Sequence, residues 1–320
     1  MSITLRQLEI FVLVAQEENV TRAAEVLRLS QSAVSMSLAE LERLLGEKLF
    51  DRQGKRLLVN DQGRALIPKA AAVLSRITEI ETFFGGSDDH LTGLLKVGAS
   101  STIGNYLMPK IFGDFTAAFP DVRLSLDVGN TEYVIQELLR FNIDIGFIEG
   151  FCHQPTITTI PWKPDDLAIH VGANHPLATR ATITAADLLE SRWILREQGS
   201  GTREVFEMAL AGKIDSIKVY LELGHTEAIK EAVEAGLGIT CLSLQTTRRA
   251  RRDGSLIALE TPFLDLRRNF YLLLHGETYR TKLMRRFMTF CQDYAAAETS
   301  EATGHKAEIT KTAGLRNEMA

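Results

Sequence analysis

Cysteine is scarce in this chain of 320 residues, where three thiols occur far apart at Cys152, Cys241 and Cys291. They have neither the spacing of metal ligands nor the even number of a disulfide framework, so we expect buried thiols in a reducing cytoplasm and no metal site. Long apolar runs are missing as well, since none approaches the roughly 20 residues that span a bilayer. The N-terminal residues lack a small-residue cleavage site, which argues against an export signal. We therefore expect a cytoplasmic protein without a membrane segment.

Patterns that support catalysis are missing too. The sequence shows no Ser-His-Asp arrangement, carboxylate pair, Walker loop or metal-ligand cluster, and Gly199-Ser200-Gly201-Thr202 does not have the phosphate-loop spacing. We therefore predict that the chain is not an enzyme and uses no cofactor.

Positive charge is in deficit overall, because the formal net charge is −5. Affinity for phosphate depends on local clustering instead, and from Leu49 to Arg76 six basic residues accompany two acidic ones. Such a run can be a merely solvated face, so its meaning depends on the segments around it.

Capping residues mark three short helices in the first fifty residues. Thr4 and Gln7 form a capping-box pattern for a helix that reaches about Glu17. The next two helix starts are expected at Thr21 and Ser30, and a stop at Gly46. Two short helices joined by a tight turn, the second with small polar residues at its start, are typical of a helix-turn-helix that enters the major groove.

A hairpin is predicted from Leu49 to Val59, with its basic tip at Gly54, and it is interpreted as a wing. In this arrangement the bases are expected to be read by Gln31, Ser32 and Ser35. The phosphates are expected to be contacted by Arg22, Arg28, Arg52, Lys55 and Arg56. A winged domain used for protein contact is the alternative.

A long helix is predicted from Asn60 or Asp61 to about Phe84. Its apolar stripe consists of Leu66, Ala70, Val73, Leu74, Ile77, Ile80 and Phe84. Pro68 lies about two turns inside, so the helix either starts later or is kinked there. A stripe of this length usually packs against a second copy, which predicts a homodimer or homotetramer.

A polar break at 85–90 separates this region from alternating strands and helices. The alternation predicts parallel sheets in two α/β lobes with a ligand cleft at their junction. The expected units are a winged helix-turn-helix at 1–60, a linker at 61–90, an effector domain at 91–294 and a disordered tail at 295–320. Within the effector domain, lobe I is expected at about 91–164 and 268–294, and lobe II at about 165–267.

Two hydroxyl-rich runs each follow a predicted strand and precede a helix: Ser100-Ser101-Thr102 and Gly199-Ser200-Gly201-Thr202. Helix N-termini with hydroxyl donors suit a small oxyanion. Ordinary capping would explain either run alone, but two runs that face one cleft favour a ligand. Thr131 is expected at the rim. Glu149 is expected to discriminate between ligands, because it would repel an anion unless it is protonated, paired or turned away.

The N-terminal pattern resembles that of the LysR-type transcriptional regulators, and the match extends from about residue 3 to about residue 294. It is carried by Leu5-Arg6-Gln7-Leu8, Phe11, Ala23-Ala24, Leu27, Ser30 to Ser35, Leu41-Glu42, Leu45-Gly46, Leu49-Phe50 and Arg52. The C-terminal half is similar to the YeiE-type and related sulfur-metabolism regulators. That likeness is carried by Ala99 to Tyr106, Asp144 to Gly150, Leu195 to Glu204 and Glu222 to Lys230.

The resemblance implies an α/β protein with a winged helix-turn-helix, a linker helix and a periplasmic-binding-protein-like effector domain. It also implies three macromolecular partners: operator DNA, further copies of the chain and RNA polymerase. The expected effector is sulfite or another sulfur oxyanion. A small carboxylate or sugar phosphate is the alternative, because similar Gly-Ser-Gly-Thr-Arg runs occur in family members that regulate carbon fixation. The lobes alone would also fit a solute-binding protein, which the winged helix and the absence of an export signal exclude.

Overall fold

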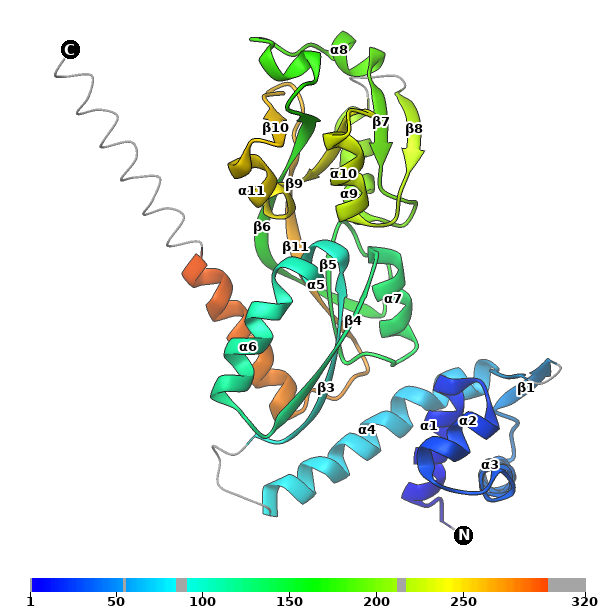
Figure 1. Ribbon diagram of the computed structural model, residues 1–320. Helices are drawn as coiled ribbons and strands as arrows, with labels where there is room; N and C mark the ends of the chain where they lie inside the picture. The colour runs from blue at the N-terminus through cyan, green and yellow to red at the C-terminus, as the bar shows by residue number, and fades with distance from the viewer. Residues whose placement is uncertain (1, 54–55, 85–90, 212–216, 299–320) are drawn as a thin grey trace.

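The computed structural model describes residues 2–53, 56–84, 91–211 and 217–298. Figure 1 shows an N-terminal helical domain, a long helix and a two-lobed α/β domain, which is the fold class expected from the sequence. Gly54 and Lys55 at the expected wing tip, the expected hinge at 85–90 and the tail from 299 onward lie outside the described residues.

The N-terminal domain consists of three helices and a two-stranded hairpin. Its elements are α1 (Leu5–Glu17), α2 (Val20–Leu27), α3 (Gln31–Leu45), β1 (Phe50–Gln53) and β2 (Arg56–Val59). Thr4 and Gln7 form the expected capping box, and Ser30 caps α3 by accepting from the backbone N–H of Ala33 at 3.1 Å. The apolar faces of the helices pack into one core around Phe11.

One helix cap differs from the sequence prediction. Helix α2 is capped by Asn19 rather than Thr21, and the backbone N–H of Thr21 donates to the Asn19 side chain at 2.9 Å. Glu18, with φ of +48°, turns the chain between α1 and α2 and leaves Asn19 in the extended conformation of a cap. Asparagine is as effective a cap as threonine, so the helix begins earlier without losing its first hydrogen bonds.

Helix α4 (Asp61–Phe84) begins where the sequence predicts. Asn60 caps it by accepting from the backbone N–H of Gly63 at 2.9 Å. Pro68 lies inside the helix, which excludes a later start, one of the two alternatives that the sequence left open. Proline removes one backbone hydrogen bond at this point, and the buried position of Pro68 offsets part of that loss.

The apolar stripe of α4 is divided between two environments. Of the stripe, Ala70 is buried in the N-terminal core beside its neighbour Ile67, and Leu66 and Leu74 pack against this core. Val73 and Ile80 remain 42% and 53% exposed. The part of the stripe nearest the wing therefore stabilises its own domain, and self-association through the rest of it stays a prediction.

A mixed sheet connects the two lobes of the C-terminal domain. Lobe I contains the strands β3 (Gly93–Ser100), β4 (Val122–Gly129), β5 (Ile145–Glu149) and β11 (Arg267–His275). Strand β6 (Ile157–Gly172) pairs with β11 as far as Asp166, then with β9 (Thr240–Ser243) and β10 (Leu256–Leu259) in lobe II. The expected parallel pairing is confirmed for β3, β4 and β5 and is wrong for β6 and β11, which are antiparallel.

Helices cover the sheet and complete both lobes. Lobe I carries α5 (Ser101–Tyr106), α6 (Met108–Ala118), α7 (Thr131–Leu139) and a helix over residues 282–298. Lobe II carries β7 (Arg192–Leu195), β8 (Lys218–Glu222), a 3-10 turn (Pro176–Thr179), α8 (Ala185–Glu190), α9 (Gly201–Leu210), α10 (Thr226–Glu234) and α11 (Leu244–Asp253). The last helix of lobe I continues past the expected start of the tail at residue 295.

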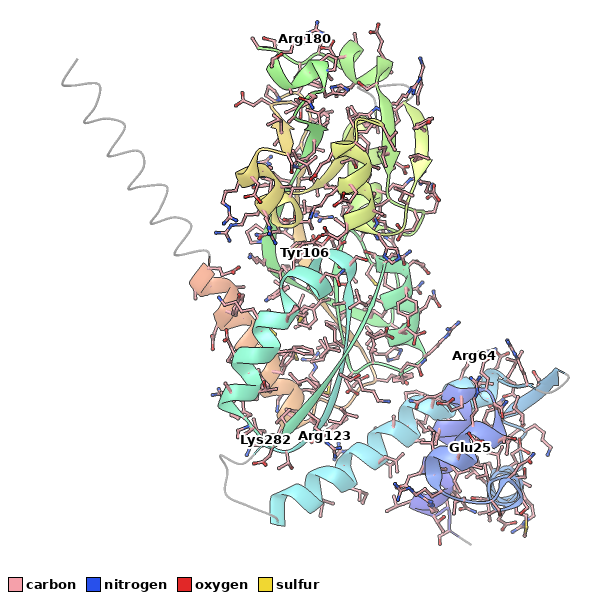
Figure 2. The ribbon with its side chains drawn as sticks, viewed as in Figure 1. Glu25, Arg64, Tyr106, Arg123, Arg180 and Lys282 are labelled. Atoms are coloured by element: carbon pink, nitrogen blue, oxygen red, sulfur yellow. The ribbon has the colours of Figure 1, made fainter. Side chains whose placement is uncertain are left out.

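The hydrophobic cores of the two lobes are separate. Phe115, Phe147 and Phe287 lie in the core of lobe I, and Trp193 and Phe206 in that of lobe II. Figure 2 shows Tyr106 near the junction of the lobes and Arg180 at the far end of lobe II. Because neither core fills the junction between the lobes, polar residues can lie there.

Cys241 and Cys291 are buried free thiols, as the sequence predicts, and burial raises their pKa values. Cys152 is half-buried. Within the described ranges, no group of three His, Cys, Asp or Glu side chains is placed to hold a metal ion. In the same ranges, every helix is too short or too polar to cross a membrane.

Candidate DNA-binding surface and inter-lobe site

The exposed face of α3 carries the side chains expected to read bases. Gln31, Ser32 and Ser35 are exposed near its N-terminus, and Val34 is buried on the opposite side. Met36 is 73% exposed on the same stretch, where an apolar side chain suits the thymine methyl group of the major groove. Met36 was not among the residues expected to contact DNA, although a large apolar side chain off the buried stripe of α3 was a signal for it in the sequence.

The arginines of this domain fall into two groups. Three are paired with acidic side chains of their own helix: Arg6 with Glu9, Arg43 with Glu40 and Arg64 with Asp61. Among the described residues, the exposed side chains of Arg22, Arg28 and Arg56 have no acidic partner. The side chain of Arg52 and all of Lys55 lie outside the described residues. The unpaired group belongs to the set expected to contact phosphates.

Glu149, at the end of β5, is the centre of the inter-lobe site and is 1% exposed. Ser100 Oγ donates to its Oε2, and Thr102 Oγ1 donates to its Oε1 at 3.1 Å. Thr131 Oγ1 donates to its backbone carbonyl at 2.7 Å. The carboxylate is thus paired, and it accepts from Ser100 and Thr102, two of the three hydroxyls of this run that were expected to meet an anion.

Helix α9 begins against this cluster. The backbone N–H of Gly201 donates to Thr131 Oγ1 at 3.2 Å, and a Cβ at Gly201 would collide with the carbonyl of Glu149. Glycine at this position therefore allows lobe II to approach the end of β5. As a result, the hydroxyl-rich runs of the two lobes meet at the same junction.

Arg268, on β11, supplies a buried positive charge that the sequence analysis missed. Its Nε donates to Asp165 at 2.7 Å and its Nη1 to Thr202 Oγ1 at 2.9 Å, while its Nη2 is buried without a partner among the described residues. Burial raises the pKa of Asp165, and the charge of Arg268 opposes that rise. Arg268 lies two residues before Phe270, the register partner of Glu149, so it shares a sheet face with Glu149.

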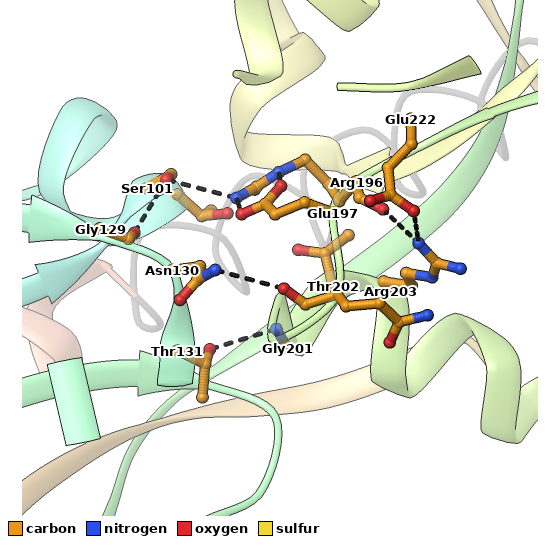
Figure 3. A network of polar contacts seen from close by, with 12 residues as sticks. Ser101, Gly129, Asn130, Thr131, Arg196, Glu197, Gly201, Thr202, Arg203 and Glu222 are labelled. Carbon is orange, nitrogen blue, oxygen red and sulfur yellow. Dashed lines mark hydrogen bonds and ion pairs between the residues drawn. The ribbon is translucent and has the colours of Figure 1, made fainter. Parts of the chain in front are cut away.

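Arg196, just after β7, is a second buried guanidinium and is 2% exposed. Its Nε and Nη2 donate to the two carboxylate oxygens of Glu197, each at 2.8 Å, and Nη2 also reaches Ser101 Oγ in lobe I at 3.5 Å (Figure 3). Ser101 Oγ donates to the carbonyl of Gly129 at 2.9 Å. Burial tends to raise the pKa of Glu197, but the hydrogen bond and charge of Arg196 hold it below its usual value.

The two lobes are closed on each other by further contacts. The backbone N–H of Glu132 donates to the carbonyl of Gly199 at 3.1 Å, and the Tyr106 hydroxyl donates to Glu227. Beside these contacts lies a cavity of about 620 Å³ between α7 and α9, lined by Thr131 and Ser200 among others. The predicted residues therefore divide: Ser100, Thr102 and Thr131 surround Glu149, Thr202 contacts Arg268, Ser101 contacts Arg196, and Ser200 lines the cavity.

Comparisons with known proteins agree with this two-part organisation. Residues 5–64 match the model of the bacterial regulatory helix-turn-helix proteins of the lysR family, and residues 88–296 match the LysR substrate binding domain. The HTH-type transcriptional regulator YeiE of Escherichia coli strain K12 is 43% identical over 291 residues, covering 91% of this chain and 98% of YeiE.

Two further proteins are similar to this chain. The RuBisCO operon transcriptional regulator of Allochromatium vinosum is 32% identical over 85% of this chain and 90% of its own. A full-length OxyR variant from Pseudomonas aeruginosa superposes with a TM-score of 0.73 at 23% identity, covering 92% of this chain and 94% of that chain. That structure supports the fold of the whole described chain.

Proposed function

Because the chain belongs to the LysR family of transcriptional regulators, we propose that its DNA binding is controlled by a small oxyanion, sulfite or another sulfur oxyanion, held at the junction of the two lobes. A regulator of this family binds DNA through its N-terminal domain and an effector through its C-terminal domain. The identity of the effector is the part that we infer.

The observation that carries the proposal is the buried guanidinium of Arg268 beside the hydroxyl-rich helix starts. Its Nη2 has no partner among the described residues, and an unsatisfied buried donor is costly. Thr202 accepts from Arg268, so its own hydroxyl hydrogen remains available. An oxyanion at this point would accept from both groups through charge-assisted hydrogen bonds.

Glu149 explains how such a site can be selective. An oxyanion and the Glu149 carboxylate would accept from the same hydroxyls of Ser100 and Thr102. Binding therefore requires that the Glu149 carboxylate gives up these hydrogen bonds, beside the point where Gly201 of lobe II approaches the backbone carbonyl of Glu149. A ligand that prefers one arrangement of the lobes shifts the population towards it, which is the physical route from effector to DNA.

On the DNA side, we propose that Gln31, Ser32 and Ser35 read base edges. The unpaired arginines Arg22 and Arg28 would contact phosphates, because no acidic side chain among the described residues competes for them. The exposed part of the α4 stripe, Val73 and Ile80, would join two subunits on a two-fold symmetric operator.

A thermal-shift screen of the full chain tests the effector class. Sulfite, sulfate, thiosulfate, phosphate and small carboxylates are compared at equal ionic strength, because a ligand that binds only the folded state raises its stability. We expect the largest shift with a sulfur oxyanion, and a smaller one in Thr102→Val. Thr289→Val is the matched control, since its exposed hydroxyl bonds only its own helix, through the carbonyl of Arg285 at 3.1 Å.

A sugar phosphate or carboxylate is the second candidate. The similarity to a RuBisCO operon regulator favours it. If only phosphate or carboxylates stabilise the protein in the screen, the sulfur oxyanion is excluded and this second candidate replaces it.

A further inference from the structure

The cavity between α7 and α9 differs in chemistry from the oxyanion site. It is lined from both lobes, and its walls include Glu132, Phe151, His153, Ser200, Glu204 and Met208. Neither buried arginine of the junction, Arg196 or Arg268, lines it. The groups that line it therefore suit a different ligand.

Carboxylates dominate the charge of this cavity. Of its three glutamates, Glu207 is paired with Arg203, whose Nε lies 2.7 Å from its Oε1. Arg203 also lines the cavity and is shared with Glu222 outside it. Glu132 accepts only from the neutral Gln136 side chain, at 2.8 Å, and Glu204 from the backbone N–H of Phe151, at 3.3 Å. Neither has a cationic partner among the residues that the structure describes.

These two unneutralised carboxylates come from different lobes. Glu132 lies on α7 in lobe I, and Glu204 lies on α9 in lobe II. Closure of the lobes brings both into the wall of one cavity, where like charges repel each other. A cation between them would convert this repulsion into attraction.

Two further features of the cavity point to an organic ligand. Phe151 and Met208 line it while remaining 40% and 58% exposed, and the His153 ring lies nearly parallel to that of Phe151. An exposed aromatic face attracts cations and covers apolar groups. Independently, Ser200 is 3% exposed, and its hydroxyl lacks a hydrogen-bond partner within the described ranges. A ligand with a polar head and an apolar stem would use both features.

We propose that this cavity binds a small organic cation, an amine or guanidinium with an apolar stem, and that the cation stabilises the closed arrangement of the lobes. The positive group is held by Glu132 and Glu204, and the stem lies along Phe151 and Met208. Because the cation contacts both lobes, it favours closure independently of the oxyanion. The protein thus responds to a second ligand, a cation, at a site separate from that of the oxyanion.

Isothermal titration of the full-length protein with 1,4-diaminobutane, agmatine and n-butylamine tests the proposal, with n-butanol and butyrate as matched neutral and anionic probes. We expect saturable binding of at least one cation and none of the two controls. Glu132→Gln combined with Glu204→Gln should weaken cation binding at least tenfold. The double change Glu190→Gln and Glu231→Gln, at two exposed positions outside the cavity, should leave it unchanged.

A second measurement guards against a folding defect. Without ligand, the Glu132→Gln and Glu204→Gln variant should melt at the same or a higher temperature than the wild type, because a repulsion is removed. Absence of saturable binding by all three cations, equal binding of n-butanol, or unchanged affinity in the variant would overturn the proposal. None of these outcomes bears on the oxyanion, which is tested with anions alone.

Discussion

The two binding regions of the molecule treat their polar side chains in opposite ways. On the DNA-binding surface, Gln31, Ser35 and Arg22 are exposed. At the lobe junction, Thr102 and Thr202 are buried and bonded to residues 47 and 66 positions away. A rigid polyanion such as DNA can be contacted by side chains that are exposed to solvent before binding. A ligand that is enclosed must take the place of internal partners, because buried polar groups need partners in its absence.

In the proposed function, Glu149 is the internal partner that occupies the position of the effector. Its carboxylate accepts from Ser100 and Thr102, as the oxygens of an oxyanion would. A regulator can thereby keep its site ordered without effector, and binding becomes an exchange of one acceptor for another. No such exchange with a buried carboxylate is needed on α3, where Gln31, Ser32 and Ser35 are exposed.

The largest expected effect concerns the exposed stripe of α4. Val73→Asp combined with Ile80→Asp should give monomers by light scattering, because two charges would be buried at the subunit contact. Operator affinity should fall more than a hundredfold as the two half-sites are bound independently. An unchanged mass would place the subunit contact elsewhere and separate DNA binding from α4.

The next effect tests the enclosed site. Thr102→Val and Thr202→Val should each weaken oxyanion binding by about 1.5–3 kcal/mol, roughly ten- to a hundredfold, since each leaves a buried polar group without its partner. DNA binding without effector should survive both changes. Titration calorimetry measures the effect, and wild-type affinity in both variants would remove these threonines from the site.

The stability of the effector domain should depend on pH through a buried histidine that the N-terminal domain lacks. Burial lowers the pKa of His170 in lobe II to about 4, whereas residues 1–84 contain no histidine. Below pH 6.5 the unfolded chain binds a proton that the folded chain takes up only near pH 4, so stability is lost as the pH falls through this window. Between pH 7 and pH 5 the effector domain should lose about 2 kcal/mol.

Tryptophan fluorescence during urea unfolding measures this loss, because both tryptophans, Trp162 and Trp193, lie in the effector domain. His170→Gln should remove most of the pH dependence. The same slope in that variant would assign the effect to other groups.

The smallest expected effect is on sequence discrimination. Gln31→Ala and Ser35→Ala should lower the ratio of operator to random-DNA affinity about tenfold, with less effect on total binding, because base contacts carry the specificity. Arg22→Ala should weaken binding to both DNAs and reduce its salt dependence, whereas the helix-paired Arg6→Ala should change neither. An unchanged ratio for Gln31→Ala would move the reading surface away from the start of α3.

The sequence predicts these regions with unequal success for physical reasons. Caps such as Thr4 and Ser30 act within three residues, so they can be recognised locally. Pro161 and Pro164 argue against a strand when the sequence is taken alone. The first half of β6 is nevertheless a strand, because among the described residues it pairs with β11 alone, and an edge strand tolerates proline. Helix α11 was missed because its buried side is narrow, formed by residues such as Thr247 and Ala250.

At the lobe junction, the sequence indicated the hydroxyl-rich runs and Glu149 but not the bonds between them. Arg268 was missed because nothing near it in sequence shows that it is buried, and its partners Asp165 and Thr202 lie 103 and 66 positions away. The sequence also left open whether Glu149 is protonated, paired or turned away. Its pairing depends on contacts across the fold, such as the hydrogen bond from Thr102, 47 positions away in the sequence.

The position of the oxyanion is tested most directly by the affinity of Glu149→Gln for sulfite, measured by titration calorimetry beside the wild type. If the carboxylate occupies the oxyanion's position, removing its charge while keeping an acceptor should tighten binding at least tenfold, the equivalent of about 1.4 kcal/mol. Equal or weaker binding by Glu149→Gln would contradict the exchange of acceptors and the placement of the anion at the lobe junction.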